Sequence, residues 1–128
     1  MILVDTSVWV DHLRRADRSL AEALAAGLVL VHPFVIGELA CGVLPGRAEV
    51  LHLLHELPFA AVASPAEALG FIDRHALAGR GVGYVDVHLL ASARITRRTV
   101  LWTRDRRLAA IAGELGVGHA AALSDPPS

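Results

Sequence analysis

Four acidic residues stand at positions where an α/β fold can bring carboxylates together. Asp5 and Asp105 each follow a short apolar run typical of a buried strand, and Asp86 begins a predicted helix after a glycine-rich loop. Glu38 lies inside an otherwise apolar helical segment. Ligands of open parallel sheets bind at the carboxyl ends of the strands, so the fold is expected to gather these side chains there.

Gathered carboxylates repel one another unless a cation joins them. Hard oxygen ligands suit Mg²⁺ or Mn²⁺ rather than zinc, and such ions activate water and stabilise charge on a phosphate. The four acids therefore predict chemistry on a phosphodiester or a phosphate ester. A purely structural alternative exists for Asp5 and Asp86 as helix caps, and for Asp105 as a cap or an ion-pair partner. That alternative is weaker for Glu38, because an acid in so apolar a run is expected to be paired or to bind metal.

The elements that must position these acids alternate along the chain. Apolar runs predict buried strands, and helical spacing between capping residues, glycines and prolines predicts helices. The expected strands are 1–4, 28–31, 57–62, 99–102 and, at most as a short final strand, 116–118. The expected helical segments are 6–26, 34–41, 47–56, 64–79, 86–97 and 106–115. Strands that alternate with helices indicate an α/β fold, with a parallel sheet and helices on both faces.

Length and composition narrow the possible classes of protein. A chain of 128 residues with 54% hydrophobic residues predicts one folded domain and excludes a disordered chain. The longest nearly apolar stretch, 23–37, is shorter than the roughly 20 residues of a membrane span. All twelve basic residues are arginine, which excludes a P-loop and a Schiff-base lysine. One cysteine, Cys41, is expected to be a buried small apolar residue in a protein of the reducing cytoplasm.

Charge is unevenly distributed over a chain whose net charge is only −1. The segment 94–107 contains six arginines against one acid and predicts a local basic patch. Arg104, Arg106 and Arg107 at its end are candidates for contacts with nucleic-acid phosphates, with a solvated helix face as the alternative. The two tryptophans, Trp9 and Trp102, are expected in the core.

Four short segments, in order, resemble the PIN-domain ribonucleases, and most closely the VapC toxins of VapBC toxin–antitoxin pairs. The segments are Val4–Trp9, Gly37–Leu39, Gly83–Asp86 and Trp102–Asp105. The resemblance extends from Met1 to about Val117, nearly the whole chain. It implies a single PIN-like domain over 1–128, in which about 119–128 is a flexible tail. Its centre is a parallel sheet of four to five strands with helices on both faces.

The activity implied by the resemblance is that of a Mg²⁺-dependent endoribonuclease, with Mn²⁺ as a possible substitute, acting on structured RNA such as tRNA or rRNA. By motif match, the catalytic and metal-binding carboxylates are Asp5, Glu38, Asp86 and Asp105. The hydroxyls that orient carboxylates or water are those of Thr6, Ser7 and Thr103. Many relatives carry an acid and an aromatic residue where this chain has Arg107 and Leu108, so a fifth acid is not expected.

The partners implied by the resemblance are RNA, a VapB-like protein antitoxin and a second copy of the chain. DNA is reached only through the antitoxin, and no membrane is involved. Excess apolar surface for the dimer and the antitoxin is expected on the early helices, at Val8, Trp9, Leu13, Phe34 and Val35. Two other functions stay open at this point: a housekeeping PIN nuclease of RNA processing, and a non-catalytic PIN module that binds RNA or protein.

Overall fold

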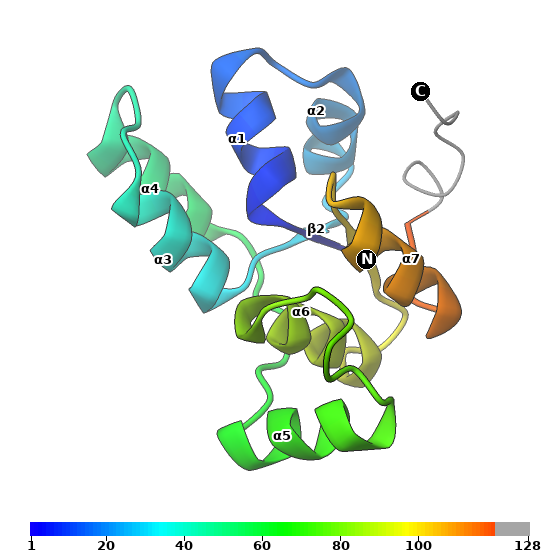
Figure 1. Ribbon diagram of the computed structural model, residues 1–128. Coiled ribbons are helices and arrows are strands. Elements are labelled where there is room, and N and C mark those ends of the chain that lie inside the picture. Colours follow the sequence, from blue (N-terminus) through cyan, green and yellow to red (C-terminus); the bar gives the residue numbers. More distant parts are fainter. Residues whose placement is uncertain (120–128) are drawn as a thin grey trace.

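A parallel sheet of three short strands forms the centre of the computed structural model, which describes residues 1–119 (Figure 1). The strands are β1 (Ile2–Val4), β2 (Val29–Leu30) and β3 (Val100–Trp102), in the order β2-β1-β3. Ile2 pairs with both Val29 and Val100, so β1 is bonded on both sides. Every residue of β1 and β3 after the first is buried, as expected for a parallel strand covered on both faces.

Two further segments touch the edges of this sheet without forming strands. Val31 bridges Phe59 at the β2 edge, and Leu101 bridges Gly118 at the β3 edge. Proline at position 58 has no N–H to donate, which limits the pairing of the first segment. The α/β parallel sheet predicted from the sequence is confirmed, although two of its five expected strands are reduced to single bridges.

Seven helices surround the sheet within the described residues. They are α1 (Thr6–Arg14), α2 (Arg18–Ala25), α3 (Pro33–Cys41), α4 (Arg47–Glu56), α5 (Pro65–Arg74), α6 (Tyr84–Ile95) and α7 (Arg106–Glu114). Figure 1 shows α1 and α2 on one side of the strands and α6, backed by α5, on the other. The helices lie on both faces of the sheet because its two connections run in opposite directions. The first leads from β1 to β2, and the second returns past β1 to β3, so right-handed crossovers place their helices on opposite faces. No helix among residues 1–119 is long and apolar enough to cross a membrane.

The core is built from the apolar stripes of these helices. In α7, Leu108, Ile111 and Ala112 have helical spacing and are buried against β3. Helix α6 is buried continuously over residues 87–93, because it lies between the sheet and α5. The expected core positions of Trp9 and Trp102 are confirmed, since each is only 3% exposed.

Four local expectations are wrong or lie outside the described part of the chain. The helical segment expected over 6–26 is two helices, because Asp17 caps α2 with an oxygen that accepts from the Leu20 N–H. Val8, Trp9 and Val35, expected as surplus apolar surface, are buried in the core. Cys41, expected to be buried, is exposed. Residues 120–128 of the predicted tail lie outside the described residues.

Candidate active site

Asp5 is the most enclosed acid of the predicted set and forms the centre of a hydrogen-bond network. It follows β1 directly, and its N–H donates to the Trp102 carbonyl at 2.9 Å, which joins the ends of β1 and β3. Asp5 is 7% exposed. Its Oδ1 accepts from the Thr6 N–H at 2.8 Å, and its Oδ2 accepts from the hydroxyls of Ser7 at 2.9 Å and Thr103 at 2.7 Å.

Ser7 and Thr103 hold Asp5 in one orientation. A hydroxyl has a single proton, and both residues donate it to Asp5 Oδ2. Each hydroxyl oxygen also accepts a backbone N–H at 3.0 Å, from Arg104 at Ser7 and from Asp105 at Thr103. The network uses three of the roughly four acceptor positions of the Asp5 carboxylate and leaves space for one further ligand.

Glu38 reaches the same region from α3. Its Oε1 accepts the hydroxyl proton of Thr6 at 2.6 Å, so α3 and α1 are linked beside Asp5. Glu38 lies in an apolar stretch of sequence and is paired, as expected of an acid there, but its side chain is exposed. Helix α3 turns Val35, Ile36 and Leu39 inward, and the polar Glu38 falls on the opposite face.

Asp86 is the half-buried third residue of α6, and its Oδ2 accepts the Gly83 N–H at 3.1 Å. Burial raises the pKa of Asp86 above its ordinary value, and the negative charges of Asp5, Asp105 and Glu38 raise it further. The hydrogen bond from Gly83 opposes this pKa shift. The charges of Asp5, Asp105 and Glu38 thus all act on the Asp86 carboxyl, so the fold brings the four predicted acids into one region.

Asp105 combines two roles that the sequence offered as alternatives. It is the N-cap of α7, where its Oδ1 accepts from the N–H groups of Arg107 at 2.9 Å and Leu108 at 3.1 Å. It is also close enough to Asp86 to raise the pKa of that carboxyl. The cap fixes Asp105 at the carboxyl end of β3, beside the carboxyl end of β1 where Asp5 lies.

The donor set fits a hard divalent cation in its chemistry. All four side chains offer carboxylate oxygens, and a cation among them would remove the repulsion that raises the pKa of Asp86. Among residues 1–119, no three side chains of the ligand-forming types already stand at metal-binding distances from one another. The acids therefore form a loose cluster, and an ion would require their carboxylates to lie closer together.

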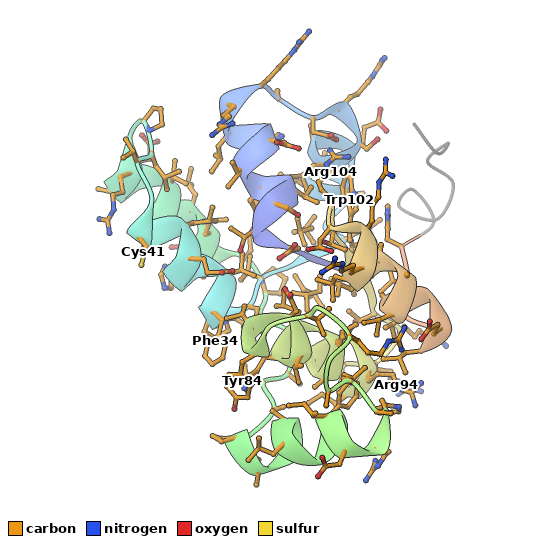
Figure 2. All side chains as sticks on the ribbon, viewed as in Figure 1. Phe34, Cys41, Tyr84, Arg94, Trp102 and Arg104 are labelled. Atoms are coloured by element: carbon orange, nitrogen blue, oxygen red, sulfur yellow. The ribbon has the colours of Figure 1, made fainter. Side chains whose placement is uncertain are left out.

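The three candidate RNA-binding arginines are engaged differently. Arg104 donates to Asp17 at 2.7 Å, approaches Asp11 at 3.3 Å and lies 5.6 Å from the centre of the Trp102 ring. Figure 2 shows Arg104 and Trp102 together near α1 and α2. These contacts keep the Arg104 guanidinium turned toward two carboxylates of its own chain. Arg106 and Arg107 are exposed in the first turn of α7.

Arg107 rests on the glycine-rich loop that precedes α6. A Cβ placed on Gly81 would lie 2.6 Å from Arg107 Nη1, so a side chain at this position would displace the guanidinium. Gly81 also has a φ of +81°, a backbone conformation that other residues rarely adopt. Arg107 therefore packs on the same loop whose Gly83 N–H donates to Asp86.

A cluster of four rings, which the sequence did not predict, lies between α3 and α6. We call His32, Phe34, Tyr84 and His88 the aromatic cluster. His32 caps α3 through Nδ1, which accepts the Phe34 N–H at 3.0 Å. The ring centres of Phe34 and Tyr84 lie 4.7 Å and 4.6 Å from that of His88. In the sequence, His32 only precedes Pro33 and His88 only lies two residues after Asp86, and neither position indicates a ring cluster.

The two histidines of this cluster are held neutral. Burial, together with a smaller effect of the nearby His88, lowers the pKa of His32 from 6.5 to about 4. Burial also lowers the pKa of His88. In the described part of the chain, His32 Nε2 and both ring nitrogens of His88 are buried without a hydrogen-bond partner.

Comparison with known proteins identifies the family. A family model described as the PIN domain matches residues 2–114. Ribonuclease VapC32 of Mycobacterium tuberculosis, strain CDC 1551 / Oshkosh, is 47% identical over 124 residues, which cover 97% of this chain and 100% of that protein. Ribonuclease VapC32 of strain H37Rv has the same identity and coverage. The chain therefore belongs to the PIN-domain family and, within it, to the VapC ribonucleases.

Proposed function

We propose that this chain is a Mg²⁺-dependent endoribonuclease, the toxin of a VapB–VapC pair, that cuts structured RNA such as tRNA or rRNA. Membership of the VapC family makes the chain a nuclease of the hydrolase class. The observation that carries the proposal further is the placement of the acids: Asp5 and Asp105 follow the paired strands β1 and β3, and Glu38 accepts from Thr6 beside Asp5. The charges of all three act on Asp86. Such a cluster, at the carboxyl ends of parallel strands, suits a metal-assisted reaction on a phosphodiester.

The ion would be held by Asp5 and Asp86, with Glu38 and Asp105 as direct or water-mediated ligands. When bound, Mg²⁺ (or Mn²⁺) lowers the pKa of a coordinated water and neutralises charge on the phosphate. Ser7 and Thr103 keep the Asp5 carboxylate in one orientation, and the Thr6 hydroxyl holds Glu38. These contacts restrict the carboxylates before an ion binds, so that less conformational freedom would be lost on binding.

The protonation state of Asp86 depends on the charges around it. With no cation nearby, the raised pKa favours a proton on the Asp86 carboxyl more than in a free aspartate. A positive charge in the cluster favours release of that proton, because it reverses the sign of the local field. Asp86 is thereby available as an anionic ligand when the site is loaded.

Positive charge for the RNA backbone comes from one side of the cluster. Arg106 and Arg107 lie in the first turn of α7, directly after Asp105, and are placed to contact phosphates next to the cut. Arg104 has weaker support for this role, because Asp11 and Asp17 already engage its guanidinium.

A VapB-like antitoxin and a second copy of the chain are the proposed protein partners, with DNA reached only through the antitoxin in the cytoplasm. Apolar side chains on the arm formed by α3 and α4 support a partner there. Val43 is fully exposed and Leu53 is 56% exposed. Phe34 is also exposed, whereas Val8, Trp9 and Val35 are too deeply buried to contribute.

The test is the cleavage of total cellular RNA by the antitoxin-free protein, with and without Mg²⁺, followed by sequencing of the new 5′ ends. The wild type and Asp73→Asn, a variant of an exposed acid on α5, are expected to give the same discrete, Mg²⁺-dependent ends. Asp86→Asn is expected to give none. Absence of ends from the folded wild type under any metal would overturn the proposal and favour a non-catalytic PIN module. New ends in precursor RNA, together with the absence of a small antitoxin gene before the gene of this chain, would favour a housekeeping nuclease.

A further inference from the structure

Two exposed aromatic rings stand next to the acid cluster. Phe34, in the first turn of α3, is 36% exposed, and Tyr84, the first residue of α6, is 46% exposed. We call these two residues the aromatic patch. Figure 2 shows them at the adjoining ends of α3 and α6, and both pack edge-on against the His88 ring beneath them. The patch is therefore a continuous ring-lined surface formed by two helices.

The position of the patch ties it to the acids. Phe34 lies four residues before Glu38 on α3, so the two side chains project from the same face one helical turn apart. Tyr84 lies two residues before Asp86 in the first turn of α6. A nucleotide whose phosphate lies at the acids thus has its neighbouring bases within reach of both rings.

A buried histidine supports the patch from beneath. His88 is 2% exposed, and the rings of Phe34 and Tyr84 both pack edge-on against it, with centres 4.7 Å and 4.6 Å from its own. Because the same buried ring contacts both aromatic side chains, His88 holds Phe34 and Tyr84 at fixed positions beside the acids.

We propose that the aromatic patch binds a nucleobase of the RNA next to the cleaved phosphate, stacked on Phe34 and Tyr84, which His88 supports from beneath. The proposal rests on the proposed function and names a substrate-binding subsite of the same active site. Stacking on aromatic rings is the common way in which proteins hold unpaired bases.

The test measures binding and uses Asp86→Asn as the background, so that RNA survives in Mg²⁺. The probe is a fluorescein-labelled RNA of about 12 nucleotides around the mapped cut, in fluorescence anisotropy. Phe34→Leu and Tyr84→Leu are each expected to weaken binding about tenfold, while Tyr84→Phe keeps the affinity. Phe59→Leu, at a comparably exposed ring on the outer edge of the sheet, is the matched control and is expected to change nothing.

An abasic residue introduced at each position of the probe in turn identifies the stacked base. At one position, the abasic residue is expected to weaken binding about tenfold when Phe34 and Tyr84 are intact. It should cause no further loss in the Leu variants, because these already lack the same contact. Losses of affinity that add up in the Leu variants, or the lack of any position at which the abasic residue weakens binding, would overturn the proposed subsite. A changed oligomeric state in the Leu variants with no sensitive position would make the patch a contact between copies. Failure of the unmodified wild type to cut any RNA would instead remove the proposed function, and the subsite with it.

Discussion

Two buried polar clusters lie close together in this protein and differ in how well their atoms are paired. The first, the Asp5 cluster, consists of Asp5, Ser7 and Thr103, and each of its side chains is hydrogen-bonded at 2.7–2.9 Å. The second is the buried histidine pair of His32 and His88, in which three of the four ring nitrogens have no partner among the described residues. Asp5, Thr103 and the two histidines are almost completely shielded from solvent, whereas Ser7 is half-buried.

The difference shows two uses of a buried polar group. A satisfied network fixes a carboxylate in one orientation, which suits a group that must hold a cation. An unsatisfied pair costs stability, about 1–3 kcal/mol for each unpaired group, and makes that part of the fold sensitive to protonation. The first cluster is therefore expected to respond to mutation in both stability and activity, and the second in stability against pH.

The largest expected effect separates two acids of the same site. Asp5→Asn and Asp86→Asn should each reduce RNA cleavage by more than about a hundredfold, because each removes a charged ligand. Asp5→Asn should also lower the free energy of unfolding by about 1–3 kcal/mol, since an amide nitrogen cannot accept the two hydroxyl protons. Asp86→Asn should leave that free energy unchanged or raise it, because the fold disfavours the charged form of Asp86.

Urea unfolding in Mg²⁺-free buffer measures this difference, with the cleavage assay run on the same preparations. Asp73→Asn, an exposed acid, serves as the control for the removal of one negative charge. Equal destabilisation by the two active-site variants would show that the hydroxyl network does not distinguish Asp5 from Asp86.

The next effect concerns the histidine pair and pH. The pKa of His32 falls from 6.5 in the unfolded chain to about 4 in the fold. Below pH 6.5 the unfolded state takes up a proton that the folded state refuses, so stability falls until the pH reaches about 4. The decrease should be about 2 kcal/mol by pH 5 and about 3 kcal/mol in full.

The histidine contribution is isolated by comparing variants in urea at pH 7 and pH 5. His32→Asn keeps an acceptor for the Phe34 N–H but does not titrate, so its stability should change less between the two pH values. His52→Asn, at an exposed histidine beside Glu56, should keep the wild-type pH dependence. The same fall in His32→Asn as in the wild type would assign the acid sensitivity to other groups.

Local signals in the sequence were enough for the Asp5 cluster. An apolar run that ends in Asp, followed by residues that favour a helix start, predicted both the strand and the cap at Asp5. The same pattern predicted the place of Asp105 at the end of β3. The structure confirms both residues as helix caps, and this role is compatible with the metal-binding role proposed for them.

The histidine pair and the exposure of Glu38 depend on packing that sequence alone does not specify. His32 and His88 come together, with ring centres 6.3 Å apart, only because the start of α3 lies near the start of α6, far away in the sequence. The face of α3 that turns to solvent is set by its contacts with α1 and α4, so composition could not place Glu38. Arg104 likewise meets Asp17 across 87 positions of sequence. The length of the two edge strands was overestimated, because a run of apolar residues does not show how many of them will pair with the sheet.

The smallest expected effect concerns the three arginines that follow Thr103. Arg104 is paired with two acids, whereas Arg106 and Arg107 lie in the first turn of α7. Arg106→Ala with Arg107→Ala should weaken RNA binding several-fold at low salt, and should flatten the slope of log K against log salt by about 0.7 for each RNA phosphate that is no longer neutralised. Arg104→Ala should change that slope little, because Asp11 and Asp17 already neutralise its guanidinium. Arg18→Ala, on exposed α2, controls for net charge. An unchanged slope in the double variant would return Arg106 and Arg107 to a solvated helix face, and RNA would then have to reach the acids from the side of the aromatic patch alone.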